Sequence, residues 1–261
     1  MRRIRFATLL TLAALSAAPL LHADTWTPTG WDGTLDLSGG SATVSVLIRT
    51  DANFAAQRSP IFEVNDRLHT GSGNTAFRMA DADDADTNGN DIGIVRDNEV
   101  TEWANGSETF PTEPDTTYLL SLVYVYDGPR LTVTAYVNGT PIYTGFATRE
   151  EQGNLTAQMF QTWPDISFYR IVSANGYAQA LTARQLAAMA GKGTSDLAAV
   201  TPLDVLQADL AMLPAAGGTV TLAGNVDASG VGEPIVLDKP VTLVGGGYTL
   251  TAPAEGPLFQ V

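Results

Sequence analysis

Short β-rich segments recur through the first two thirds of the chain. Nine runs between residues 33 and 173 are rich in β-branched and aromatic residues, and Gly, Pro, Asn or Asp stands between many of them. Runs of this length and spacing are typical of an antiparallel β-sandwich. The sequence therefore predicts an all-β fold over residues 24–191.

The segment 131–137 alternates between apolar and more polar side chains. Its apolar face carries Leu131, Val133, Ala135 and Val137, and its other face carries Thr132, Thr134 and Tyr136. Asn138-Gly139 follows directly, and both residues of this dipeptide accept the positive φ that a tight turn needs. The pattern predicts a β-hairpin that turns at 138–139.

The order of these segments resembles the laminin G-like, or concanavalin A-like, jelly-roll family. The resemblance covers residues 25–191 and is most specific at "YVNG", residues 136–139, and at "ALT", residues 180–182. It implies a two-sheet jelly-roll closed by a short helix near 182–190, which Thr182 caps and Gly191 ends. Leu186 and Met189 form the apolar face of that helix. Members of the family often bind glycans, and some hold calcium.

An acidic segment at residues 81–93 has the pattern of a calcium loop. Asp84, Asp86, Asn88 and Gly89 reproduce the D-x-D-x-N-G opening, in which alternate oxygen ligands converge on one cation. The closing acidic residue is absent, because an EF-hand register would place it at Val95. Asp91 or Asp97 could substitute for it. Two interpretations stay open: a calcium site that includes Asp84, Asp86, Asn88 and Asp91, and a solvated acidic hairpin loop.

Two tryptophans are the ligand-binding residues that the sequence suggests. Trp103 and Trp163 stand beside turn residues, where a flat ring could be exposed and cover the apolar face of a sugar. The alternative is that each ring caps the core of the sandwich, since Trp is usually largely buried.

Composition excludes several function classes. The net charge is −14, and such an acidic surface repels phosphate backbones, so nucleic acid is not an expected partner. The chain has no cysteine, which excludes a disulfide framework and thiolate metal sites. His69 is the only histidine after residue 23, and no GxSxG motif accompanies it. No catalytic constellation is present, which favours a non-catalytic protein.

Residues 1–23 have the pattern of a signal peptide. A basic "MRRIRF" precedes an apolar run that is short for a membrane span, and "LHA" precedes Asp24 as a cleavage site. We expect removal of residues 1–23, export to the medium or the bacterial cell surface, and no membrane span afterwards. The alternative is an uncleaved membrane anchor.

The last part of the chain has a different pattern. A linker at 192–200 leads to Thr201, a helix cap, and Pro202, the first helical residue, with leucines at helical spacing up to Leu213. Three β-rich runs follow, "GTVTLAG", "EPIVLD" and "KPVTLVGGG". Residues 201–261 resemble the start of the right-handed parallel β-helix of pectin lyase-like proteins, whose first helix plugs the open end. One or two coils leave strand edges unpaired, so a longer parent protein is expected.

Two function classes follow from this organisation. In the first, the chain is a non-catalytic secreted or surface protein that binds glycans or an extracellular matrix polymer through the jelly-roll, with the β-helix as a stalk. In the second, it is the N-terminal region of a polysaccharide lyase or glycoside hydrolase whose active site lies on further coils. The lack of a catalytic constellation favours the first class.

Overall fold

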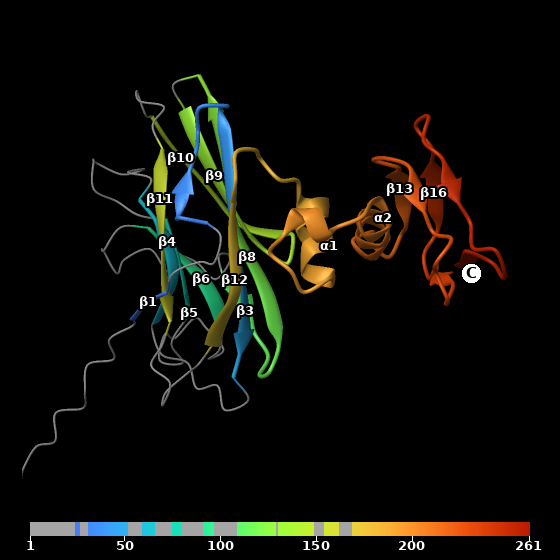
Figure 1. Ribbon diagram of the computed structural model, residues 1–261, viewed down its shortest axis with the longest axis horizontal. Coiled ribbons are helices and arrows are strands. Elements are labelled where there is room, and N and C mark those ends of the chain that lie inside the picture. The colour runs from blue at the N-terminus through green and yellow to red at the C-terminus, as the bar shows by residue number, and fades with distance from the viewer. Residues whose placement is uncertain are drawn as a thin grey trace, which may run out of the picture.

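The structure of the chain is a computed structural model that describes residues 24–26, 31–51, 59–65, 75–79, 91–96, 109–128, 130–148, 154–161 and 169–261. These residues form a β-sandwich and a smaller group of parallel strands (Figure 1). Two helices, α1 (Ala183–Gly191) and α2 (Pro202–Ala211), lie between them. Among the described residues, no helix is both long enough and apolar enough to cross a bilayer.

Twelve strands of the described residues build the sandwich. Their bounds are β1 Asp24–Trp26, β2 Thr34–Leu35, β3 Ser41–Thr50, β4 Ser59–Val64, β5 Thr75–Met79, β6 Asp91–Arg96, β7 Thr109–Pro111, β8 Thr117–Asp127, β9 Arg130–Val137, β10 Thr140–Thr148, β11 Leu155–Gln161 and β12 Tyr169–Tyr177. One sheet has the order β10-β9-β8-β3-β12, and the other has the order β1-β11-β4-β5-β6-β7, with β2 paired to β11. All of these pairs are antiparallel, which confirms the predicted sandwich.

The inward faces of both sheets share one apolar core. Phe62 and Phe77 of one sheet, with ring centroids 5.1 Å apart, belong to the same buried cluster as Val46 and Leu122 of the other. The alternation predicted for β9 is confirmed, because its four apolar residues are fully buried and its polar ones are only partly covered. The hairpin is confirmed as well, since φ is +52° at Asn138 and +81° at Gly139.

The closing helix α1 packs on the outer face of the five-stranded sheet. Leu186 and Met189 of α1 are buried against Leu47, Leu119 and Val123 of the sheet. Thr182 and Gln185 form a capping box at its start, as a helix with this sequence favours. The N-cap expectation is therefore confirmed, and the outer face of this sheet is part of a second small core.

The helix α1 ends at Gly191, as the sequence predicts. Gly191 is the last helical residue, and Lys192 follows in the right-handed region because its N–H still donates to the Ala188 carbonyl, 3.1 Å away. The residue that takes the left-handed conformation is Gly193, with φ +63°. The helix thus ends at Gly191, and the left-handed glycine that follows it is Gly193.

The segment assigned to a linker, 192–200, is packed against the sandwich. Ser195 is fully buried; its hydroxyl accepts from Asn175 Nδ2 and donates to Ser173 Oγ, both at 2.8 Å. The Tyr177 hydroxyl donates to the Ser195 carbonyl and accepts from the Leu197 N–H, at the start of the short 3-10 helix Leu197–Ala199. These bonds fix the path of the chain from α1 to α2.

Beyond α2, six short strands form three parallel pairs. The strands are β13 Gly218–Thr221, β14 Val226–Asp227, β15 Ile235–Val236, β16 Val241–Val244, β17 Leu250–Thr251 and β18 Phe259–Gln260. Each of the first three strands pairs with one of the last three: Gly218 with Val241, Val226 with Leu250 and Ile235 with Phe259. The sequence separation is nearly the same in all three pairs. Two successive coils of nearly equal length therefore lie side by side in register.

The helix α2 covers one edge of these coils. Leu206 is buried with Val220, Leu222 and Val226, and the other leucines of the predicted stripe lie around this cluster, half-buried. The ammonium of Lys239, which precedes β16, donates to the carbonyls of Ala211 and Leu213 at 3.3 and 2.9 Å. The second coil thereby binds the C-terminal end of α2, where a cation is favourable.

Candidate functional site

Most of the site residues suggested by the sequence lie outside the described residues. This holds for Trp103, Trp163, Asp84, Asp86 and Asn88, and for the lone histidine. Asp91 is described as the first residue of β6, where its backbone pairs with that of Pro111. Within the described ranges, no three acidic or histidine side chains gather closely enough to hold a metal ion. The calcium and tryptophan sites therefore stay predictions.

The calcium prediction has a direct test. If Asp84, Asp86 and Asn88 bind the ion, calcium stabilises the folded chain by about 2.7 kcal/mol at a hundredfold excess over Kd. We expect the melting temperature to rise with calcium chloride and to fall back with chelator, and Asp86→Ala to abolish this response. Asp196→Ala, far along the chain on an exposed turn, is the matched control and should keep it. A melting temperature indifferent to calcium and chelator would leave the segment as a solvated acidic loop.

The described surface of the five-stranded sheet is only partly free. Its centre lies under α1, because Leu47, Leu119 and Val123 are buried there. Two ends of the same face stay open. One carries Val125, which is 40% exposed, and the other carries Arg49, Arg170 and Val172. A ligand on this sheet must therefore bind beside the helix, at one of the two ends.

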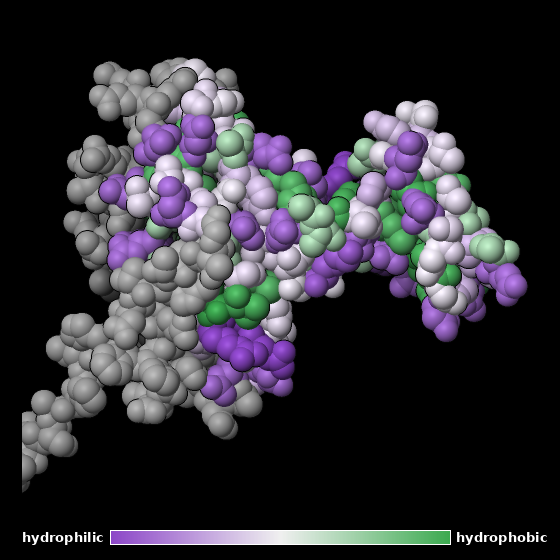
Figure 2. Space-filling model, in the orientation of Figure 1, coloured by the Kyte–Doolittle hydropathy of each residue, from purple (hydrophilic) through white to green (hydrophobic). Residues whose placement is uncertain are grey.

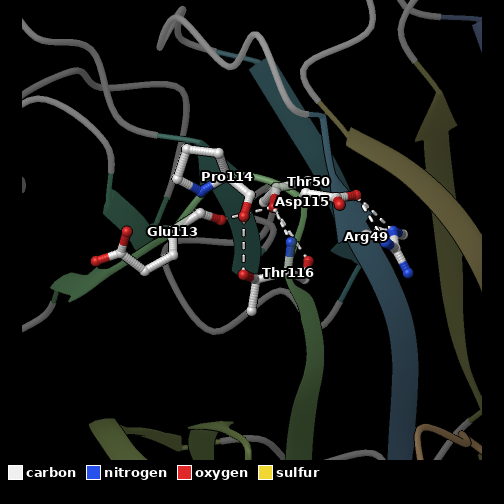
Figure 3. Close-up of polar contacts among 6 residues, drawn as sticks. All are labelled: Arg49, Thr50, Glu113, Pro114, Asp115 and Thr116. Atoms are coloured by element: carbon white, nitrogen blue, oxygen red, sulfur yellow. Dashed lines mark hydrogen bonds and ion pairs between the residues drawn. The ribbon is translucent and has the colours of Figure 1, made fainter.

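The second of these ends is bordered by a hydrogen-bonded turn between β7 and β8 (Figure 3). The Thr50 hydroxyl donates to the Glu113 carbonyl at 2.7 Å and accepts the Thr116 N–H at 2.9 Å. Thr116 Oγ1 donates to the Pro114 carbonyl at 2.9 Å. Asp115, at the tip, has φ +53°, a conformation that is uncommon outside glycine. The turn thus holds the Asp115 carboxylate in a defined position beside β3.

Two arginines lie on neighbouring strands at this end. Arg49 donates to one oxygen of Asp115 from two nitrogens, at 2.7 and 3.0 Å. Arg170 of β12 lies directly opposite Arg49 in the strand register, and Val172, 49% exposed, follows on the same strand. Figure 2 shows strongly hydrophilic residues beside a hydrophobic group. Both lie at the lower end of β3 and β12 in this view.

A separate hollow of about 500 Å³ lies between α1 and α2. Alanines form much of its lining, and two ion pairs join the helices: Lys192 with Asp204 at 3.0 Å and Arg184 with Asp209 at 3.5 Å. Partial burial acts to raise the pKa of Asp204, but its hydrogen bonds with Thr201 and Lys192 lower that pKa overall. Partial burial raises the pKa of Asp209, and Arg184 offsets part of this effect. The hollow is therefore part of the junction between α1 and α2.

The proximity of Arg49 and Arg170 on adjacent strands is a candidate site feature that the sequence patterns did not indicate. The two residues lie far apart in the sequence, and neither belongs to a motif. Their neighbourhood follows only from the register between β3 and β12. A signal was present in each strand separately, since both arginines interrupt apolar β-rich runs at an outward-facing position.

No family model matches the chain, and a search of curated proteins finds no match. Solved structures resemble parts of it at low identity. A heptameric SAP-like pentraxin from Limulus polyphemus is 16% identical over 60% of this chain and 71% of its own, with a TM-score of 0.34. The metal-free carbohydrate recognition domain of Emp46p is 8% identical over 60% and 76%, with a TM-score of 0.39. A Trypanosoma rangeli sialidase in complex with sialic acid is 12% identical over 67% and 27%, with a TM-score of 0.41. These scores are low, and the strand pairing alone establishes the two antiparallel sheets.

Proposed function

We propose that this chain is an exported, non-catalytic glycan-binding protein of the secreted or surface-attached kind. In this proposal a laminin G-like sandwich binds the sugar, and residues 201–261 begin a parallel β-helix that serves as its stalk. Trp103 and Trp163 contribute aromatic surface to the sugar site, and the acidic loop holds calcium.

One contact supports the laminin G-like assignment more than any other. The two motifs on which the resemblance rests, the 136–139 hairpin and the 180–182 helix start, meet in space. Gly139 packs so closely on α1 that a Cβ there would lie 2.6 Å from the Ala183 carbonyl oxygen and 2.6 Å from the Ala187 nitrogen. Both motifs are therefore parts of one packing unit, as a shared fold would require.

The repeating parallel pairs support the β-helix assignment. Three pairs with nearly equal sequence separation are the pattern of stacked coils, and α2 covers one open edge of the stack. The second coil, on the other side from α2, leaves Val244 and Tyr248 exposed. That side is the surface on which the proposed β-helix would extend by a further coil.

The junction of α1 and α2, between the sandwich and the parallel coils, supports the division into a binding domain and a stalk. Each helix is buried on its own side, α1 in the sandwich and α2 on the coils, and two ion pairs join them. In Figure 1 the sheet that contains β4 and β11 lies on the side of the sandwich away from the coils.

A glycan array with the full chain tests the proposal. We expect saturable binding to a limited set of glycans, without release of reducing ends or unsaturated sugars from the same polymers. Trp103→Ala and Trp163→Ala should each weaken binding, whereas Tyr248→Ala, an exposed aromatic on the coils, should not. Failure to bind any glycan would overturn the binding role. Turnover of a polysaccharide by the chain would instead favour the lyase or hydrolase class.

A further inference from the structure

We propose that the pair formed by Arg49 and Arg170 at the edge of the five-stranded sheet binds the carboxylate of an acidic sugar. This inference rests on the proposed glycan-binding function and names the ligand class and the place of a binding site. The site has three elements: two guanidinium groups from neighbouring strands, the exposed Val172 side chain, and the Asp115 turn that positions one of the arginines.

Both arginines point outward from the same face of the sheet. Ile48 and Ile171, their neighbours in the sequence, are paired in register and buried in the core. Since side chains alternate along a strand, Arg49 and Arg170 are directed to the opposite, solvent side. Cβ atoms of directly paired residues are about 5 Å apart, so both guanidinium groups can contact one small anion.

Only one of the two arginines has an acidic partner within the described part of the chain, although Asp51 and Glu113 also lie at this end of the sheet. Arg49 is paired with Asp115, at 2.7 Å, whereas Arg170 has no ion pair or hydrogen bond from its side chain to any described residue. Like charges directly opposite each other in a sheet destabilise it. An anion bound between the two guanidinium groups removes that repulsion.

The chemistry of the two groups favours a carboxylate. The planar guanidinium of Arg170 presents two parallel N–H donors, a geometry that matches the two oxygens of a carboxylate. Arg49 is held by the Asp115 turn, which limits the side-chain entropy lost on binding. Val172, 49% exposed beside them, offers an apolar surface to the carbon-bound hydrogens of a sugar ring. Because β12 is the edge strand, the ligand can approach from the side of the sheet.

The experiment compares matched ligands that differ only in the carboxylate. Binding of the full chain to trigalacturonate and to its methyl ester is measured by calorimetry at low salt, together with 3′-sialyllactose and its methyl ester. We expect at least one acidic probe to bind about 10- to 100-fold more tightly than its neutral partner, the range expected for a charge-assisted pair of hydrogen bonds. Added salt should reduce this preference.

Variants assign the effect to the arginine pair. Arg170→Gln should reduce the affinity for the acidic probe to that for the neutral one. Arg170→Lys should give an intermediate affinity, because lysine keeps the positive charge but lacks the two parallel N–H donors. Arg130→Gln, on β9 of the same sheet, is the control and should leave the preference unchanged.

Three outcomes would count against the site. Equal binding of acidic and neutral probes, with no effect of Arg170→Gln, would overturn the inference and leave glycan binding standing. An acidic preference that survives Arg170→Gln would place the carboxylate elsewhere. Failure of these probes and of the whole array would overturn both the site and the proposed function.

Discussion

A chain carrying Gly139→Ala is expected to unfold at a much lower temperature than the wild type. Gly139 has φ +81°, which costs an alanine about 1–2 kcal/mol. The added Cβ would also lie 2.7 Å from the Ala187 Cβ and even closer to the backbone of α1, so the hairpin and the helix must separate. Separation weakens the burial of Leu186 and Met189. We expect a total loss of about 3 kcal/mol or more in the free energy of unfolding, measured by urea denaturation.

Gly128→Ala is the matched control for this variant. Gly128 also occupies a turn with positive φ, +61°, but nothing lies within 4 Å of a Cβ at that position. It should show only the conformational cost, about 1–2 kcal/mol. Equal losses in the two variants would mean that the hairpin does not pack on α1 as described.

Leu206→Ala is expected to release the parallel coils while the sandwich stays folded. Leu206 is 3% exposed and lies at the centre of the small cluster with Val220, Leu222 and Val226. Truncation of a buried leucine costs about 2–5 kcal/mol. Because the coil region has so few fully buried residues, a loss of that size is large compared with its own stability. Hydrogen exchange should show lost protection at β13 and β14, with protection at β3 and β8 retained.

Met212→Ala tests whether the effect depends on burial. Met212 follows the same helix and is 48% exposed, so its truncation removes little buried surface. Its exchange pattern should match that of the wild type. Loss of protection in the sandwich as well as the coils after Leu206→Ala would show that the two parts unfold as one cooperative unit.

Local patterns in the sequence were sufficient to predict the local structure. The alternation in β9, the turn at Asn138 and the caps at Thr182 and Thr201 depend on residues a few positions apart, and each is confirmed. The end of α1 at Gly191 is confirmed as well. Side chains at Trp103, Trp163, Asp84, Asp86 and Asn88 lie outside the described residues, so those predictions stand untested.

Features that depend on distant pairing could not be predicted in this way. Trp31 illustrates the reason, because its ring packs against Gly176, where a Cβ would lie 2.4 Å from the ring. Nothing near Trp31 in the sequence indicates this contact, which requires the position of β12 in the sheet. The Arg49–Arg170 pair and the buried Ser195 hydroxyl depend on the same strand. Register between distant strands was thus the missing information.

The sequence separation of the paired strands has a consequence for the order in which the chain folds. Thr43 of β3 pairs with Val123 and with Tyr177, both on strands far along the chain, and Asp24 of β1 pairs with Gln161. Pairs between the two coils, in contrast, join positions that are close in the sequence. Long-range pairing slows folding because a large loop must close before any contact forms. During synthesis β1 must therefore wait until Gln161 has been made, and one edge of β3 must wait until Tyr177 has been made, so the part made first is completed late.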